Sequence, residues 1–77
     1  MNKIIVNGQT TTIINSGRFI SYDFLVALAH GEQPRDIIHD ITYRRGHKED
    51  ESGSLNRGKS VKLKDGMIFN VAVTDNN

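Results

Sequence analysis

The sequence predicts a small α+β domain, with one mixed sheet and one helix packed across its inner face. Three observations support this prediction. An Asn-Gly pair separates two β-branched segments near the N-terminus, residues 21–34 have the pattern of a helix with both ends marked, and apolar residues alternate along residues 67–73. The 77 residues leave room for one domain with a modest core.

The first predicted element is a β-hairpin. Lys3–Val6 and Thr10–Asn15 are short β-branched segments, and the Asn-Gly pair between them tolerates the positive φ angles of a type I′ turn. Because side chains alternate along a strand, Ile4 and Val6 should share one face, and Ile5 should lie on the other.

A helix is predicted over about Tyr22–His30. Ser21 is a suitable N-cap, Gly31 fits the position that follows the last turn, and Pro34 prevents continuation. Apolar residues at three- to four-residue spacing predict the stripe that faces the core, namely Phe24, Leu25 and Leu28. The aromatic residues around the start of the helix, Phe19 and Tyr22, are expected to pack in the core or on the helix flank.

Two further long strands are predicted. The first is Ile37–Arg44, in which Ile41 and Tyr43 alternate with Thr42 and Arg44. The second is Met67–Val73, which is apolar enough to be central in the sheet rather than at its edge. Its core-facing residues should be Met67, Phe69, Val71 and Val73.

The segment between these strands is polar and glycine-rich. It predicts a long loop over residues 46–60, with at most a short strand near Ser52–Leu55. After it, Val61 and Leu63 alternate with two lysines, and Lys64–Gly66 forms a turn.

Composition excludes several classes of function. Ten Lys and Arg against nine Asp and Glu give a net charge of +1, too balanced to predict non-specific binding of nucleic acid. The sequence has no cysteine, which excludes disulfides, thiolate zinc sites and cysteine nucleophiles. No apolar segment approaches the roughly 20 residues that a membrane span needs. We therefore expect a cytoplasmic protein without a membrane partner or a cofactor.

The three histidines and the two adjacent arginines raise the question of a metal site and of RNA binding, and the sequence favours neither. The histidines, His30, His39 and His47, lack short ligand spacing, so no metal site is predicted, and His30 is better explained by its place at the negative end of the helix dipole. Arg44 and Arg45 suggest RNA binding, a minor hypothesis because three acidic residues at 49–51 follow at once. No arrangement of residues predicts an enzyme.

The order of the elements resembles the β-grasp order of ubiquitin. Three segments, "IIVNGQ" at 4–9, "ISYDFLVALAHG" at 20–31 and "VKLKDGMIFNV" at 61–71, are similar to bacterial multiubiquitin-type domains. The resemblance covers roughly Lys3 to Val73. It implies a ubiquitin-like β-grasp fold with a mixed four- to five-stranded sheet, formed by residues 1–73, and a flexible tail at 74–77.

The resemblance also implies a function. Such proteins are protein modifiers that are conjugated through the C-terminal carboxylate, which here belongs to Asn77. The implied partners are an activating-enzyme-like protein, a conjugating-enzyme-like protein, a processing peptidase and a covalent protein target, in stress or antiphage defence. Thr74, Asp75 and Asn76 would be recognised by the activating enzyme or the peptidase. The alternative is a β-grasp module that binds its partner without a covalent bond.

The tail departs from the pattern of ubiquitin-like proteins. Those tails commonly end in two glycines, whereas this chain ends in Asp75, Asn76 and Asn77. Three explanations stay open: a wider partner site that accepts asparagine, a product already trimmed by a peptidase, or a chain that is incomplete or never conjugated. Four extended residues would reach about 13 Å at most.

A second departure concerns the outer face of the sheet. Ubiquitin is recognised there through an apolar patch, but the corresponding positions here fall near Thr42 and Asn70, which are polar. We therefore expect a more polar partner surface that also uses Tyr43, Arg44 and Arg45, since an aromatic residue beside arginines is typical of interface hot spots.

Overall fold

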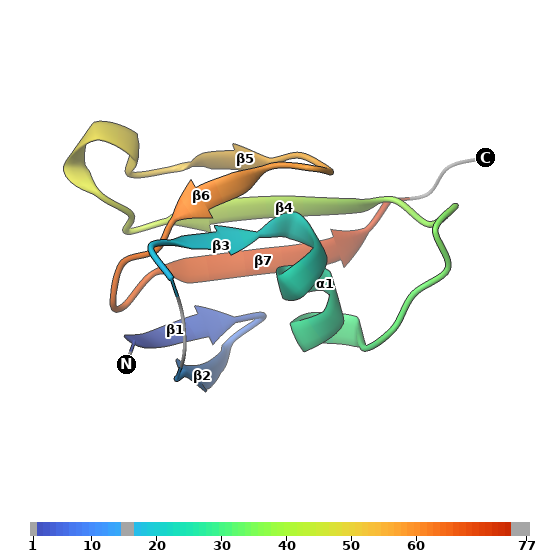
Figure 1. Ribbon diagram of the computed structural model, residues 1–77, viewed down its shortest axis with the longest axis horizontal. Coiled ribbons are helices and arrows are strands. Elements are labelled where there is room, and N and C mark those ends of the chain that lie inside the picture. Colours follow the sequence, from blue (N-terminus) through green and yellow to red (C-terminus); the bar gives the residue numbers. More distant parts are fainter. Residues whose placement is uncertain (1, 15–16, 75–77) are drawn as a thin grey trace.

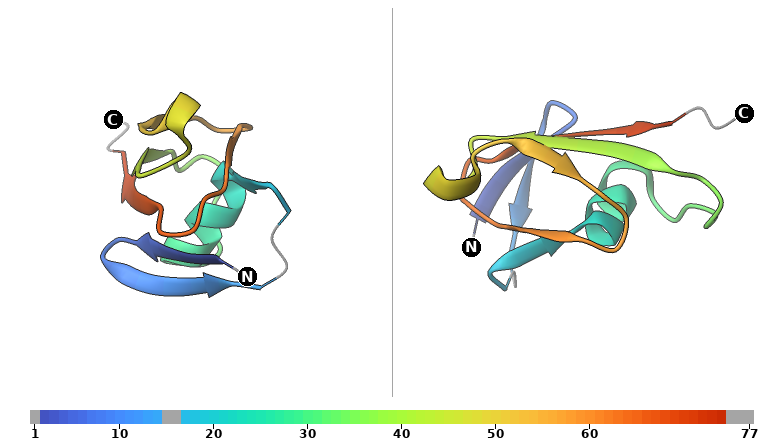
Figure 2. Two further views of the ribbon diagram at one scale, coloured as in Figure 1. Left: turned by 90° about the vertical axis from the view of Figure 1, so that its left-hand side faces the viewer. Right: turned by 90° about the horizontal axis from the view of Figure 1, so that it is seen from above.

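The computed structural model describes residues 2–14 and 17–74. In chain order, its elements are β1 (Asn2–Val6), β2 (Gln9–Ile13), β3 (Phe19–Ser21), α1 (Tyr22–His30), β4 (His39–Arg44), the 3₁₀ helix η1 (Lys48–Asp50), β5 (Gly53–Leu55), β6 (Ser60–Lys62) and β7 (Ile68–Val73). Five strands form a mixed sheet in the order β2-β1-β7-β4-β5, and α1 packs on one face of it (Figures 1 and 2). The predicted α+β, β-grasp architecture is confirmed.

Strand β7 lies in the middle of this sheet, as its apolar sequence predicted. It pairs in parallel with β1 and antiparallel with β4, along the whole length of β4. Because β1 and β7 come from opposite ends of the sequence, their pairing brings the first and last strands side by side (Figure 1).

The predicted hairpin is confirmed. Asn7 and Gly8 have φ angles of 51° and 81°, which the type I′ turn requires. Ile4 and Val6 are buried, and Ile5, on the opposite face, is half-buried. The second strand ends at Ile13 rather than at residue 15, which lies outside the described residues.

The helix has the predicted bounds and the predicted ends. The Ser21 hydroxyl accepts a hydrogen bond from the Phe24 N–H at 3.1 Å, which satisfies one of the free donors of the first turn. Gly31 has a φ angle of 76°, and its N–H donates to the Ala27 carbonyl at 2.8 Å. A positive φ at this position is the reason that glycine ends the helix.

The face that α1 turns to the core differs from the prediction. Tyr22, Leu25 and Val26 are buried, whereas Phe24 and Leu28 are 44% and 37% exposed. The helix carries two overlapping apolar stripes, and spacing alone does not decide which one faces the sheet. The choice follows from packing: the Tyr22 ring lies in the core and its hydroxyl accepts a hydrogen bond from the backbone of the sheet.

Three strand predictions also need correction. The third long strand begins at His39, not Ile37. Val73 is 54% exposed rather than part of the core, because it is the last residue of β7 and its cross-strand neighbour on the inner face is the imidazole of His39. Phe19 is exposed in β3, which the sequence did not predict and which forms a two-stranded sheet with β6.

The connection after β4 is more ordered than the predicted loop. It contains η1 and then β5, a strand within the predicted 52–55 stretch. The Gly46 N–H donates to the Glu51 carbonyl at 2.9 Å, which closes the connection. A side chain at Gly46 would put its Cβ 2.7 Å from the Asp50 carbonyl oxygen, so only glycine fits there.

Candidate protein-interaction surfaces

The sheet face that points away from α1 carries mostly polar side chains. Thr42 and Asn70 are cross-strand neighbours on β4 and β7, both exposed, and Arg44 lies on the same face opposite Ile68. Ile68 pairs on its other side with Ile5, and these two half-buried residues form a small apolar centre. The structure thus brings together three of the five residues predicted for a partner surface. We call this surface the outer face.

Tyr43 does not belong to the outer face. Because residues alternate along β4, its side chain lies on the core side and is only 8% exposed. Its hydroxyl donates a hydrogen bond to the Asp50 carboxylate at 2.6 Å. This hydrogen bond, followed by burial and the Asp50 charge, raises the pKa of Tyr43 to about 12. Tyr43 therefore holds η1 to the sheet, which corrects its prediction as a surface residue.

Arg45 follows β4 directly and is exposed. Its φ angle of 61° marks the sharp turn with which the chain leaves the sheet. Arg45 is therefore not part of β4, which ends at Arg44. The two arginines at 44 and 45 are thus adjacent in sequence but belong to different local structures.

The predicted conjugation site lies largely beyond the described residues. Asp75, Asn76 and Asn77 are outside them, and Thr74 is the last residue that the structure describes. The Thr74 N–H donates to the Ile38 carbonyl at 2.8 Å, so the backbone is held beside β4 up to this point. β7 delivers it to the end of the sheet opposite the start of β1 (Figure 1).

Asn7 has a second role that the hairpin pattern did not reveal. Its side-chain oxygen accepts a hydrogen bond from the Val71 N–H at 2.7 Å, and its side-chain nitrogen donates to the Val71 carbonyl at 3.0 Å. These two bonds extend the contact between the chain and β7 beyond Val6, where β1 ends. The two residues are 64 positions apart, so no local sequence signal could have identified the contact.

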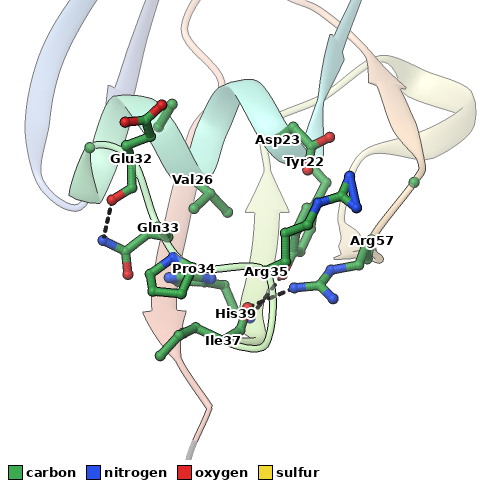
Figure 3. A pocket seen from close by; sticks show the side chains of 13 residues that line it. Tyr22, Asp23, Val26, Glu32, Gln33, Pro34, Arg35, Ile37, His39 and Arg57 are labelled. Carbon is green, nitrogen blue, oxygen red and sulfur yellow. Dashed lines mark hydrogen bonds between the residues drawn. The ribbon is translucent and has the colours of Figure 1, made fainter.

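A cleft of about 460 Å³ lies between the start of α1, the 31–38 segment and Arg57 (Figure 3). His39 is 4% exposed, stacks on His30 at 5.2 Å, and donates its backbone N–H to the Tyr22 hydroxyl at 2.8 Å. The Arg57 guanidinium lies 5.9 Å from the centre of the Tyr22 ring and donates to the Ile37 carbonyl at 2.7 Å. These contacts hold the 31–38 segment to the helix and the sheet.

Burial favours the neutral form of His39. Burial, followed by the charges of His30 and Arg57, lowers the pKa of His39 below 6.5. His30 lies in the last turn of α1, as predicted, and its Nε2 is 3.0 Å from the Val71 carbonyl. Among the described residues, no three His, Cys, Asp or Glu side chains are grouped so that they could hold a metal ion.

The fold and the first-with-last strand pairing define a ubiquitin-like β-grasp domain. The chain belongs to the multiubiquitin family, whose family model matches residues 2–75. Comparisons with curated proteins and with solved structures gave no significant match. In the part of the chain that the structure describes, no helix has the length and apolar character to cross a membrane.

Proposed function

We propose that this domain is a bacterial ubiquitin-like protein modifier that is conjugated through the carboxylate of Asn77. Membership of the multiubiquitin family over residues 2–75 is the observation that carries the proposal. The fold is compatible with it, because the central strand β7 leads the chain to one end of the sheet, next to the residues that would be recognised, Thr74, Asp75 and Asn76.

The proposed chemistry takes place on the partner enzyme. A carboxylate is a poor acyl donor, so an ATP-dependent activating enzyme would convert it to an acyl adenylate with release of pyrophosphate. An enzyme thiol would displace AMP, and an amine of the target protein would displace the thiol to form an amide. The modifier itself supplies a folded body for recognition and a reactive end, and none of its side chains acts as a catalyst.

The partners follow from this chemistry. An activating-enzyme-like protein is required, and a conjugating-enzyme-like protein and a processing peptidase would complete the system. We place the reaction in the bacterial cytoplasm, in stress or antiphage defence. The outer face, with Thr42, Arg44 and Asn70, is the proposed contact surface for these enzymes, and its polar side chains differ from the apolar patch of ubiquitin.

The direct test is conjugation with purified components. The chain ending at Asn77 is incubated with ATP and a cognate activating-enzyme-like protein, and the products are analysed by mass spectrometry. We expect an adduct whose mass is the sum of the two proteins less one water, with the new bond at Asn77. The matched control lacks residues 75–77 and should form no adduct. The proposal would be overturned if the enzyme is shown to be active in adenylate formation but gives no covalent adduct with this chain.

The alternative is a module that binds its partner without a covalent bond. The polar outer face is the observation that favours it, because exposed arginine and amide groups can serve an interface without any reaction at the chain end. The same truncation separates the two functions. Removal of residues 75–77 would leave the binding of such a module intact but would abolish the activity of a modifier.

A further inference from the structure

An apolar groove of about 490 Å³ lies between β2, β3 and one side of α1. Four of its lining side chains are large, apolar and exposed: Ile14 (72%), Phe19 (60%), Phe24 (44%) and Leu28 (37%). In Figure 2 (left), β2 lies at the rim of the main sheet. This groove is on a different surface from the outer face.

The concentration of apolar side chains in the groove calls for an explanation. The described residues include six large apolar side chains that are exposed, and four of the six line this one groove. Isolated exposed apolar residues are normal, but a contiguous group of them marks an interaction site. Phe24 and Leu28 do not contribute to the core, because another stripe of α1 faces it.

The wall formed by β2 offers unpaired backbone groups. Within the described residues, β2 pairs only with β1. The Ile5 N–H donates to the Met67 carbonyl and the Gly66 N–H donates to the Lys3 carbonyl, so Ile5 and Lys3 direct their backbone groups away from β2. Their partners Thr10 and Thr12 are thus at the non-hydrogen-bonded positions of the hairpin, and their backbone groups point to the free edge.

Three basic residues lie next to residues that line the groove, along the chain or across the β3–β6 pair. Arg18 lies between two lining residues, Lys62 is the cross-strand neighbour of Phe19, and Lys59 precedes the lining residue Ser60. All three basic residues are exposed. Asp23, next to Phe24 on the helix, lines the separate cleft at His39 instead. In a protein of net charge +1, this rim is a local basic region that favours an acidic partner.

We propose that the groove binds an extended segment of a partner protein, with apolar residues flanked by acidic ones. The segment would add to the free edge of β2 as a further strand, where backbone hydrogen bonds give affinity. Its apolar side chains would cover Phe24 and Leu28, and its acidic residues would face Arg18 and Lys62. A second copy of this chain fits less well, because it would bring a second basic rim against the first. The proposal does not depend on conjugation.

The test uses the full chain and two synthetic peptides. One peptide has four consecutive valine and isoleucine residues followed by four glutamates, and the other has lysines in place of the glutamates. Binding is measured by NMR titration of the labelled protein. We expect saturable shifts along 10–14 and 19–28 with the acidic peptide only. Leu28→Glu should weaken binding about tenfold or more, as for a central interface residue.

Two variants probe the mode of binding. Thr12→Pro removes an outward N–H from an edge strand, where proline is tolerated, and should weaken binding without loss of the fold. Ile38→Glu replaces an exposed apolar residue outside the groove and should bind as the unaltered chain does. Equal binding of the lysine peptide, shifts centred on another surface, no shifts at all, or dimers of the free chain formed through β2 would each overturn the proposal.

Discussion

His39 is a buried polar side chain at the base of the cleft beside α1. Its ring stacks on His30, its backbone binds the Tyr22 hydroxyl, and Arg57 lies near enough to disfavour a second positive charge. Among the described residues, its Nε2 has no hydrogen-bond partner. Burial without a partner for this atom favours the neutral imidazole over the protonated one.

The burial of His39 predicts that stability falls in acid. Its pKa is lowered in the folded state, so the unfolded chain binds the proton more readily, and stability is full above pH 6.5 and decreases as the pH falls through the folded-state pKa. The slope from this one group can reach about 1.4 kcal/mol per pH unit. Urea unfolding at a series of pH values measures it. His39→Gln should flatten the profile, and a profile equal to that of the unaltered chain would contradict the prediction.

At the scale of elements, the connection from β4 to β5 depends on one side-chain contact and one glycine. The Tyr43 hydroxyl reaches across to Asp50 in η1, and Gly46 allows the two backbones to approach. The composition of this segment predicted a solvated loop because its residues are mostly charged. The order comes from the hydrogen bond between η1 and Tyr43, a tyrosine that was predicted as a surface residue but is buried on the core side of β4.

The Tyr43–Asp50 contact can be measured directly. Asp50→Asn weakens the hydrogen bond from the Tyr43 hydroxyl and removes the carboxylate charge, so the Tyr43 pKa should fall from about 12 toward 10.0. The contact stabilises the neutral form of Tyr43 and so raises its pKa in the folded state. The stability that this contact contributes is therefore lost as the pH rises from 10.0 through about 12. The Tyr43 ring resonances followed by NMR over that range report the titration. Glu49→Gln is the control, and an unchanged Tyr43 pKa in Asp50→Asn would count against the contact.

The local sequence pattern predicted the ends of α1 but not which of its faces packs on the sheet. Ser21, Gly31 and the bounds between them were predictable, because capping depends on neighbours in sequence. The rotation of α1 was not, because the Tyr22 and Phe24 stripes both have helical spacing and the decision depends on a sheet assembled from distant strands. That missed rotation is also why the groove could not be foreseen.

In the whole molecule, the contacts that form between residues distant in sequence could not be predicted either. The central place of β7 followed from the sequence, since apolar strands belong inside a sheet. The β-grasp order of the elements was expected from the resemblance to ubiquitin. The alternation along β4 would have placed Tyr43 inside, and only its position beside two arginines suggested a surface role. The contact between Asn7 and Val71 needed the closed fold.

This contact predicts a global effect of a single turn residue. Asn7→Gly keeps a residue that accepts a positive φ but deletes both hydrogen bonds to Val71, each of which contributes about 0.5–1.5 kcal/mol. We expect the free energy of unfolding to fall by about 1–3 kcal/mol, measured by urea denaturation, with faster amide exchange at Val71. Asn56→Gly, in an exposed turn, controls for the added flexibility. A variant as stable as the parent, with an equally protected Val71 amide, would disprove the role.

The parallel pairing of β1 and β7 also determines how the domain responds to mechanical force. A pull applied between the two ends of the chain would act along these strands in opposite directions and load their connections in shear. The Ile5-to-Met67 and Asn7-to-Phe69 backbone bonds, and both side-chain bonds from Asn7, would then bear tension together. A hairpin pulled open at its ends breaks its bonds one after another instead. This domain should therefore resist an ATP-driven unfoldase that pulls one end while the other is held.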